Sequence, residues 1–141
     1  MKYSIHLTLF IFAVHVLVAE SNVSKLCNSF SDCTAKALKT DIYRKKISFY
    51  EEALRIFKKS DGELSRSKVL LLKANATVRE ALGDTGYKGE IALKVTHKPE
   101  YKSAQLKKAT ADLNEAEKQY EGFNTSEQAL FGELRELIQS N

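Results

Sequence analysis

Residues 32–59 of this chain read DCTAKALKTDIYRKKISFYEEALRIFKK, a stretch of 28 residues without glycine or proline. Apolar side chains recur in it at steps of four, three, four and three residues, at Tyr43, Ile47, Tyr50, Leu54 and Phe57. This spacing places them along one side of an α-helix. We therefore predict a single helix over 32–59, with Asp32 as its N-cap. It should bury Tyr50, Leu54 and Phe57 against other helices and expose Glu52, Arg55 and Lys59.

The same periodicity predicts a second helix over about 65–82. Its inner face carries Leu70, Ala74, Val78 and Ala81, and the turn VLLL at 69–72 is apolar on all sides. We therefore expect it to be the most buried helix. Residues 83–90 contain three glycines and should form a loop. Residues 91–97 fit a short helix or a strand, and the helical context favours one or two turns of helix.

Two more helices complete the predicted fold. One begins at Pro99, which suits a first helical turn, and ends at Gly122; its seam is Leu106, Ala109, Leu113, Ala116 and Tyr120. The last begins at Thr125, where Gln128 completes a capping box, and runs to about Gln139. It should be buried through Leu130, Leu134, Leu137 and Ile138. The sequence thus predicts an all-α fold, an antiparallel helical bundle or a helix-hairpin repeat of about four to five helices, in one domain over 20–141.

Residues 1–19 have the layout of a secretory signal peptide. Lys2 supplies a positive start, residues 5–18 are mostly apolar, and Ala19 is a small residue at the expected cleavage site. The apolar run is too short to span a bilayer, and polar residues follow it at once. We therefore expect a secreted, extracellular protein with no stable membrane span.

Two further features are typical of secreted proteins. Three asparagines, Asn22, Asn75 and Asn124, begin N-glycosylation motifs, although a glycan at Asn75 conflicts with burial of the second helix. Cys27 and Cys33 are the only cysteines, and an even pair in an oxidising compartment predicts a disulfide. Free thiols or bridges to another chain are the alternatives.

Charge is unevenly distributed along the chain. Residues 20–108 hold 19 basic and 11 acidic residues, whereas 109–141 hold two basic and seven acidic residues. Either the two regions neutralise each other within the fold, or a basic face meets an acidic partner or an anionic surface. Five lysines within 15 residues are the candidate partner-binding residues: Lys94, Lys98, Lys102, Lys107 and Lys108.

Short motifs resemble those of tetratricopeptide-repeat proteins. FYEEALRIF at 49–57 is similar to the second helix of such a repeat, and ALGD at 81–84 is similar to the ending of a first helix. PEYK at 99–102, followed by LKKA at 106–109, resembles the start of the next repeat. The resemblance covers about 35–120 and implies a helix-hairpin scaffold that binds peptides on a concave face. It also places Lys39, Lys102 and Lys107 near positions that clamp a partner's carboxylate.

The residues of the chain favour binding over catalysis. Beyond residue 19 there is one histidine, His97, which we expect to be solvated in a loop beside Pro99. No histidine pair, phosphate-binding glycine loop or calcium loop is present, so we predict no metal, no cofactor and no enzyme activity. We expect no nucleic-acid partner, because the chain is predicted to be exported and carries no recognised nucleic-acid-binding motif. Two functions remain: a glycosylated helical interaction protein that binds a protein or peptide, or a small helical carrier of a lipid or other apolar ligand.

Overall fold

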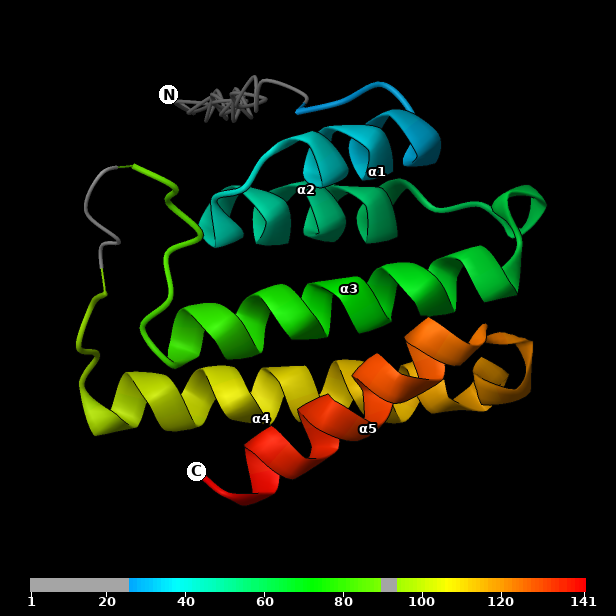
Figure 1. Ribbon diagram of the computed structural model, residues 1–141. Coiled ribbons are helices and arrows are strands. Elements are labelled where there is room, and N and C mark those ends of the chain that lie inside the picture. The colour runs from blue at the N-terminus through cyan, green and yellow to red at the C-terminus, as the bar shows by residue number, and fades with distance from the viewer. Residues whose placement is uncertain (1–25, 90–93) are drawn as a thin grey trace, which may run out of the picture.

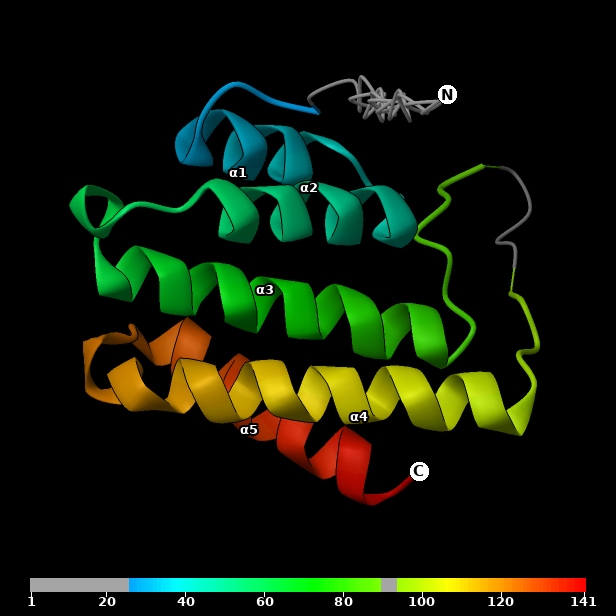
Figure 2. The same ribbon diagram turned by 180° about the vertical axis from the view of Figure 1, so that it is seen from behind.

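A computed structural model describes residues 26–89 and 94–141. Within these residues the chain forms the helices α1 (Phe30–Lys39), α2 (Tyr43–Ile56), α3 (Glu63–Ala81), α4 (Pro99–Ala116) and α5 (Thr125–Gln139), with no strand. Two short 3₁₀ helices, η1 (Lys59–Asp61) and η2 (Glu117–Gly122), precede α3 and α5. Successive helices run antiparallel, as Figures 1 and 2 show, so the all-α bundle expected from the sequence is confirmed. The predicted signal peptide and the motif at Asn22 lie outside the described residues.

The predicted uninterrupted helix over 32–59 is wrong, because residues 40–42 separate α1 from α2. Thr40 and Ile42 adopt extended backbone angles, with ψ values of 139° and 115°. No glycine or proline causes this break; contacts with the loop after α3 accompany it. The backbone N–H of Tyr43 donates to the carbonyl of Thr85 at 3.1 Å. Gly86 lies so close to the Asp41 carbonyl that a Cβ atom there would overlap it. Tertiary contacts therefore set the turn between these two helices.

The ends of the predicted helix also differ. α1 begins at Phe30, and its N-cap is Ser29, whose side chain accepts a hydrogen bond from the N–H of Asp32 at 3.1 Å. Asp32 instead accepts from the N–H of Asn28 and from Lys36, and these bonds lower the pKa of its carboxyl group. α2 ends at Ile56, because Phe57 has left the helical region.

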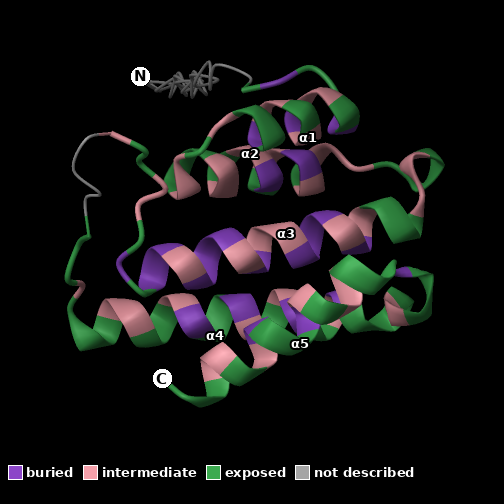
Figure 3. Ribbon diagram, viewed as in Figure 1, coloured by how far each residue is buried: buried purple, intermediate pink, exposed green. Residues whose placement is uncertain are grey.

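α3 separates two apolar cores (Figure 3). Its residues Leu70, Leu71, Ala74, Val78 and Ala81 pack against α4 and α5, so the predicted inner face is confirmed. Val69 packs on the other side with residues of α1, α2 and the segment before them: Cys27, Phe30, Cys33, Ala37, Tyr50 and Ala53. Ten residues of α3 are buried, which bears out its prediction as the most buried helix.

The predicted stripe of α2 faces this second core only in part. Tyr50 is 2% exposed, and its burial raises the pKa of the phenol to about 12. Leu54 and Phe57 are half-buried rather than buried, and the Phe57 ring packs edge-on against Phe30 at 5.6 Å. Glu52 is half-buried too, contrary to the prediction, whereas Arg55 and Lys59 are exposed as expected.

The second half of the chain follows the predicted helices more closely. Pro99 is the first residue of α4, and Leu106, Ala109, Leu113 and Ala116 are all buried. The predicted end at Gly122 is wrong, because α4 ends at Ala116 and the half-buried Tyr120 lies in η2. The predicted Thr125–Gln128 capping box of the last helix is wrong by one residue. Asn124 caps α5 by accepting from the N–H of Glu127 at 2.9 Å, and the Glu127 side chain accepts from the N–H of Asn124.

Two other expectations for the second half need correction. Leu130, Leu137 and Ile138 of α5 are half-buried, whereas Leu134 and the unpredicted Phe131 are buried. The described residues 94–98 form no helix. They lie extended, with a bridge between Asp84 and Lys94 and a hydrogen bond from the N–H of Val95 to the carbonyl of Gly83 at 2.9 Å. Residues 90–93, in which the rest of the predicted turn falls, lie outside the described part of the chain.

Cys27 and Cys33 form a disulfide with Cα atoms 5.2 Å apart, in agreement with the prediction. Both cysteines are buried, at 3% and 0% exposure. The bridge therefore ties the segment before α1 to the inner face of that helix. Because it closes a loop of only a few residues, we expect its entropic contribution to stability to be modest.

Ion pairs explain much of the uneven charge. α3 presents Arg66 and Lys73 to Glu115 and Asp112 of α4, and it presents Lys68 and Arg79 to Glu127 and Glu133 of α5. In all four pairs the cation lies on α3 and the anion lies in the acidic C-terminal part. The first interpretation of the charge distribution, that the two regions neutralise each other, therefore holds for α3.

Replacing a leucine in the α3–α4 core should measurably destabilise the protein. Leu113 is fully buried, and the Leu113→Ala variant should lose about 2–5 kcal/mol of unfolding free energy through lost apolar contact and the cavity that remains. Urea unfolding followed by circular dichroism measures this change. Leu64→Ala, at a leucine that is 36% exposed, is the control and should lose far less. Equal losses in both variants would contradict the placement of this core.

Candidate binding site

An apolar groove runs along one side of α3, between α1 and the start of α5. Its volume is about 560 Å³. Helix α3 supplies Ser65, Lys68, Val69 and Leu72, which recur at helical spacing and form the floor. The remaining lining residues are Phe30, Ser31, Thr34, Ala35 and Leu38 of α1, with Asp61 of η1 and Glu127 of α5. We call this the α1–α3–α5 groove.

The groove offers apolar surface rather than reactive groups. Leu38 is 61% exposed, the highest value among the exposed large apolar residues of the described chain. Two rim charges form an ion pair, since Lys68 lies 3.0 Å from Glu127. The Asp61 carboxylate accepts a hydrogen bond from the backbone N–H of Lys58 at 2.8 Å.

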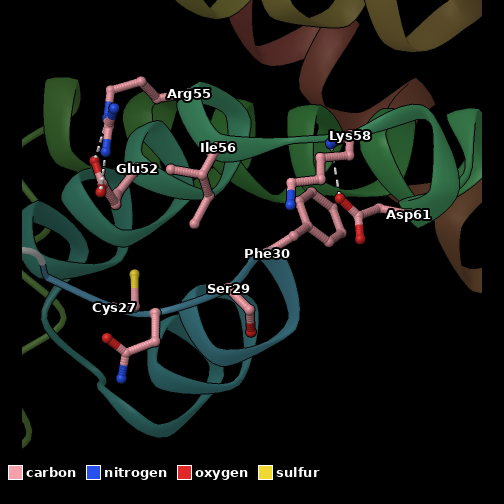
Figure 4. Close-up of a pocket in the computed structure, with 9 residues that line it drawn as sticks. Cys27, Ser29, Phe30, Glu52, Arg55, Ile56, Lys58 and Asp61 are labelled. Atoms are coloured by element: carbon pink, nitrogen blue, oxygen red, sulfur yellow. Dashed lines mark hydrogen bonds and ion pairs between the residues drawn. The ribbon is translucent and has the colours of Figure 1, made fainter.

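A smaller hollow of about 340 Å³ adjoins the groove on the side of the disulfide (Figure 4). Phe30 and Asp61 line both hollows. Arg55 of this hollow donates to both carboxylate oxygens of Glu52, at 2.6 and 2.7 Å. Cys27 belongs to the disulfide, so no thiol is available in this hollow. The Glu52–Arg55 pair lies along α2, and Asp61 accepts from the N–H of Lys58 at the start of η1.

A buried carboxylate, that of Glu80, joins four parts of the chain. Its side chain is 5% exposed and accepts from Arg44 of α2 at 3.0 Å and from the Tyr101 hydroxyl of α4 at 2.8 and 3.0 Å. His97 Nε2 lies 3.5 Å from the same carboxylate. Burial, followed by the hydrogen bond to Glu80, raises the pKa of Tyr101. This cluster fastens the loop before α4 to α2 and α3.

The expectation that His97 is solvated is therefore wrong. Its side chain is only 12% exposed, and its ring lies 4.6 Å from that of Tyr101. Sequence periodicity could not have found this contact, because Glu80 falls within the polar positions of α3 and its partners are far apart in the chain. A glutamate near the end of the helix predicted to be the most buried is a signal for such a contact.

The five candidate lysines do not form one site. Lys94 and Lys98 precede α4, Lys107 and Lys108 lie exposed further along it, and Lys102 donates to the side chain of Asn141 at 2.9 Å. Lys39, which the repeat resemblance groups with Lys102 and Lys107, lies at the end of α1. Figure 1 shows α1 and α4 on opposite sides of α3, so these three lysines cannot converge on one carboxylate in this arrangement.

Neither metal ligands nor a membrane-spanning helix are evident among the described residues. In residues 26–89 and 94–141, no three His, Cys, Asp or Glu side chains are grouped to hold a metal ion. Within the same residues, no helix combines the length and apolar character that crossing a bilayer requires.

The two described glycosylation motifs differ in access. Asn124 is exposed, and the oxygen of its side chain caps α5, which leaves the amide nitrogen for a glycan. Asn75 lies within α3, its side-chain oxygen is buried without a hydrogen-bond partner, and Thr77 is 3% exposed. A glycan on Asn75 would compete with the packing of the central helix.

Comparison with known proteins gives no relative. No family model, no curated protein and no solved structure matches this chain.

In the protein secreted from eukaryotic cells, we expect a glycan at Asn124 and none at Asn75, because chains modified at Asn75 could not pack α3. Intact mass before and after enzymatic deglycosylation measures this, with Asn75→Gln and Asn124→Gln as matched variants. Asn124→Gln should remove the mass of one glycan and Asn75→Gln should remove none. A loss of glycan mass in Asn75→Gln would contradict the assignment.

Proposed function

We propose that this chain is a secreted, glycosylated helical protein that binds another protein or peptide through the α1–α3–α5 groove and performs no catalysis. The observation that carries this proposal is the groove itself, with its apolar lining, the Lys68–Glu127 ion pair at its rim and the exposed Leu38. Exposed apolar surface of this kind in a soluble domain typically marks an interaction site.

The dimensions of the groove favour a short apolar segment. Ser65 and Leu72 lie two helical turns apart, roughly 10 Å along the axis of α3. A partner helix of that length presents two or three apolar side chains on one face, spaced to contact Leu72 and Leu38. The sequence resemblance to tetratricopeptide-repeat proteins adds to this proposal, since that family binds peptides on a concave helical face.

Three features support the secretory part of the proposal. The first 19 residues have the pattern of a signal peptide, the cysteines are bridged, and the glycosylation motif at Asn124 is exposed. Disulfides form and persist in oxidising compartments such as those of the secretory pathway.

A carrier of a lipid or another apolar ligand is the second candidate, favoured by the apolar lining of the same groove. Ligand-carrying pockets usually enclose 70–90% or more of a small ligand's surface. This groove is open along one side, which suits a peptide better than a ligand that must be shielded from water.

Polar substitution at the groove should abolish partner binding. We expect Leu38→Asp to lose the partner that the wild-type protein captures from extracellular fluid, because a desolvated carboxylate would face the apolar segment. Leu26→Asp is the control, since Leu26 is also exposed, at 45%, but lies outside the groove. Mass spectrometry identifies the captured protein, and hydrogen exchange of the complex should show new protection within 30–38 and 65–72.

Two outcomes would contradict the proposal. If Leu38→Asp and Leu26→Asp capture the same proteins as the wild type, the groove is not the binding site. If organic extraction of the secreted protein yields a bound lipid that Leu38→Asp loses, the carrier function replaces the interaction function.

A further inference from the structure

Half of the ten lysines that have no ion pair among the described residues gather on a second surface, separate from the groove. Lys39, Lys45, Lys46, Lys94 and Lys98 have no acidic partner among the described residues. All five lie at one end of the bundle, where α1 ends, α2 and α4 begin and the loop after α3 folds back (Figure 1). Arg44 and Lys88 lie at the same end, paired with Glu80 and Asp41. We call this the basic end.

Exposed apolar side chains accompany these cations. Leu82, Tyr87 and Val95 are 37%, 51% and 45% exposed, and they lie on the end of α3 and on the described parts of the loop. Contacts hold these segments beside the α1–α2 turn: Lys88 pairs with Asp41, Tyr43 bonds to Thr85, and Val95 bonds to Gly83. Cations and apolar side chains are therefore displayed together by one ordered end of the molecule.

The opposite end of the bundle differs in charge. The basic end holds seven described cations against four described carboxylates, those of Asp41, Glu80, Asp84 and Glu100. At the opposite end Asp61, Glu63, Glu117 and Glu121 accompany Lys58 and Lys59, so acidic residues offset the lysines there. The molecule is polarised along its helices, and an anionic surface would attract it with the basic end forward.

We propose that the basic end docks on the surface of a membrane that contains anionic phospholipids. Lysines beside a bilayer are attracted to anionic headgroups, and exposed apolar and tyrosine side chains enter the headgroup region. The three apolar residues lie on short separate segments around the end of the bundle rather than along one groove. That arrangement suits the fluid headgroup region of a bilayer better than the fixed surface of a folded protein. This docking is independent of the groove, because none of these residues lines it.

Vesicle co-sedimentation tests the proposal with protein recovered from the medium of secreting cells. The wild type should bind vesicles of phosphatidylcholine with about 30 mol % phosphatidylserine and should bind neutral phosphatidylcholine vesicles far more weakly. The double variant Lys39→Glu/Lys45→Glu should reduce the partition coefficient by about tenfold or more, since each lysine near such a surface contributes appreciably to the free energy of membrane binding. Lys58→Glu/Lys59→Glu makes the same change of net charge at the other end and should retain most binding.

A second variant separates lipid docking from plain charge attraction. Tyr87→Ser/Val95→Ser keeps every charge and should still reduce vesicle binding several-fold, because apolar insertion is lost. Equal losses in the two lysine double variants would overturn the proposal, and so would full binding by Tyr87→Ser/Val95→Ser. Retention on immobilised heparin without binding to anionic vesicles would also overturn it, in favour of a soluble polyanion. Circular dichroism confirms that each variant is folded.

Discussion

Burial of α3 on two opposite faces is the constraint on which the rest of this structure depends. Leu71, Ala74 and Val78 are fully buried against the α4–α5 side, while Val69 faces the α1–α2 side. α3 contributes buried residues to both cores, so each core depends on this helix. Small residues make the contact close: Ala74 and Ala81 of α3 pack in the same cluster as Ala109 and Ala116 of α4. The α1–α3–α5 groove lies where Ser65, Lys68 and Leu72 of α3 stay at least partly exposed beside the α1–α2 core.

Electrostatics follow the same arrangement. The cations of α3 reach the acidic residues of α4 and α5, and one of these pairs is largely buried: Lys73 Nζ lies 3.1 Å from Asp112 Oδ1. Burial raises the pKa of Asp112, while Lys73 opposes that shift. The lysines that have no ion pair among the described residues lie on the α1–α2 turn and the loop before α4, and also along α4 and beside η1. Part of the uneven charge is thus neutralised by ion pairs within the fold, and part remains at the surface.

Helical periodicity predicted the inner faces of α3 and α4, because there a single stripe of Leu, Ala and Val coincides with one continuous core. It failed at residues 40–42, where Thr40, Asp41 and Ile42 carry no breaking signal and the turn depends on Thr85, Gly86 and Lys88. The Glu80 cluster escaped prediction for a similar reason, since Arg44, His97 and Tyr101 converge only in the folded chain. The groove is likewise assembled from three helices. The local sequence pattern is enough to predict helices and the disulfide. Sites assembled from distant segments can be recognised only from the packed structure.

The shared role of α3 can be tested directly by native-state hydrogen exchange of the disulfide-bonded protein. If both cores depend on this helix, amides within 69–78 should exchange most slowly, and only through global unfolding. Amides of α1, α2, α4 and α5 should show no protection that outlasts that of α3. Persistent protection of the α1–α2 pair, or of α4 and α5, after the α3 amides have exchanged would contradict the account.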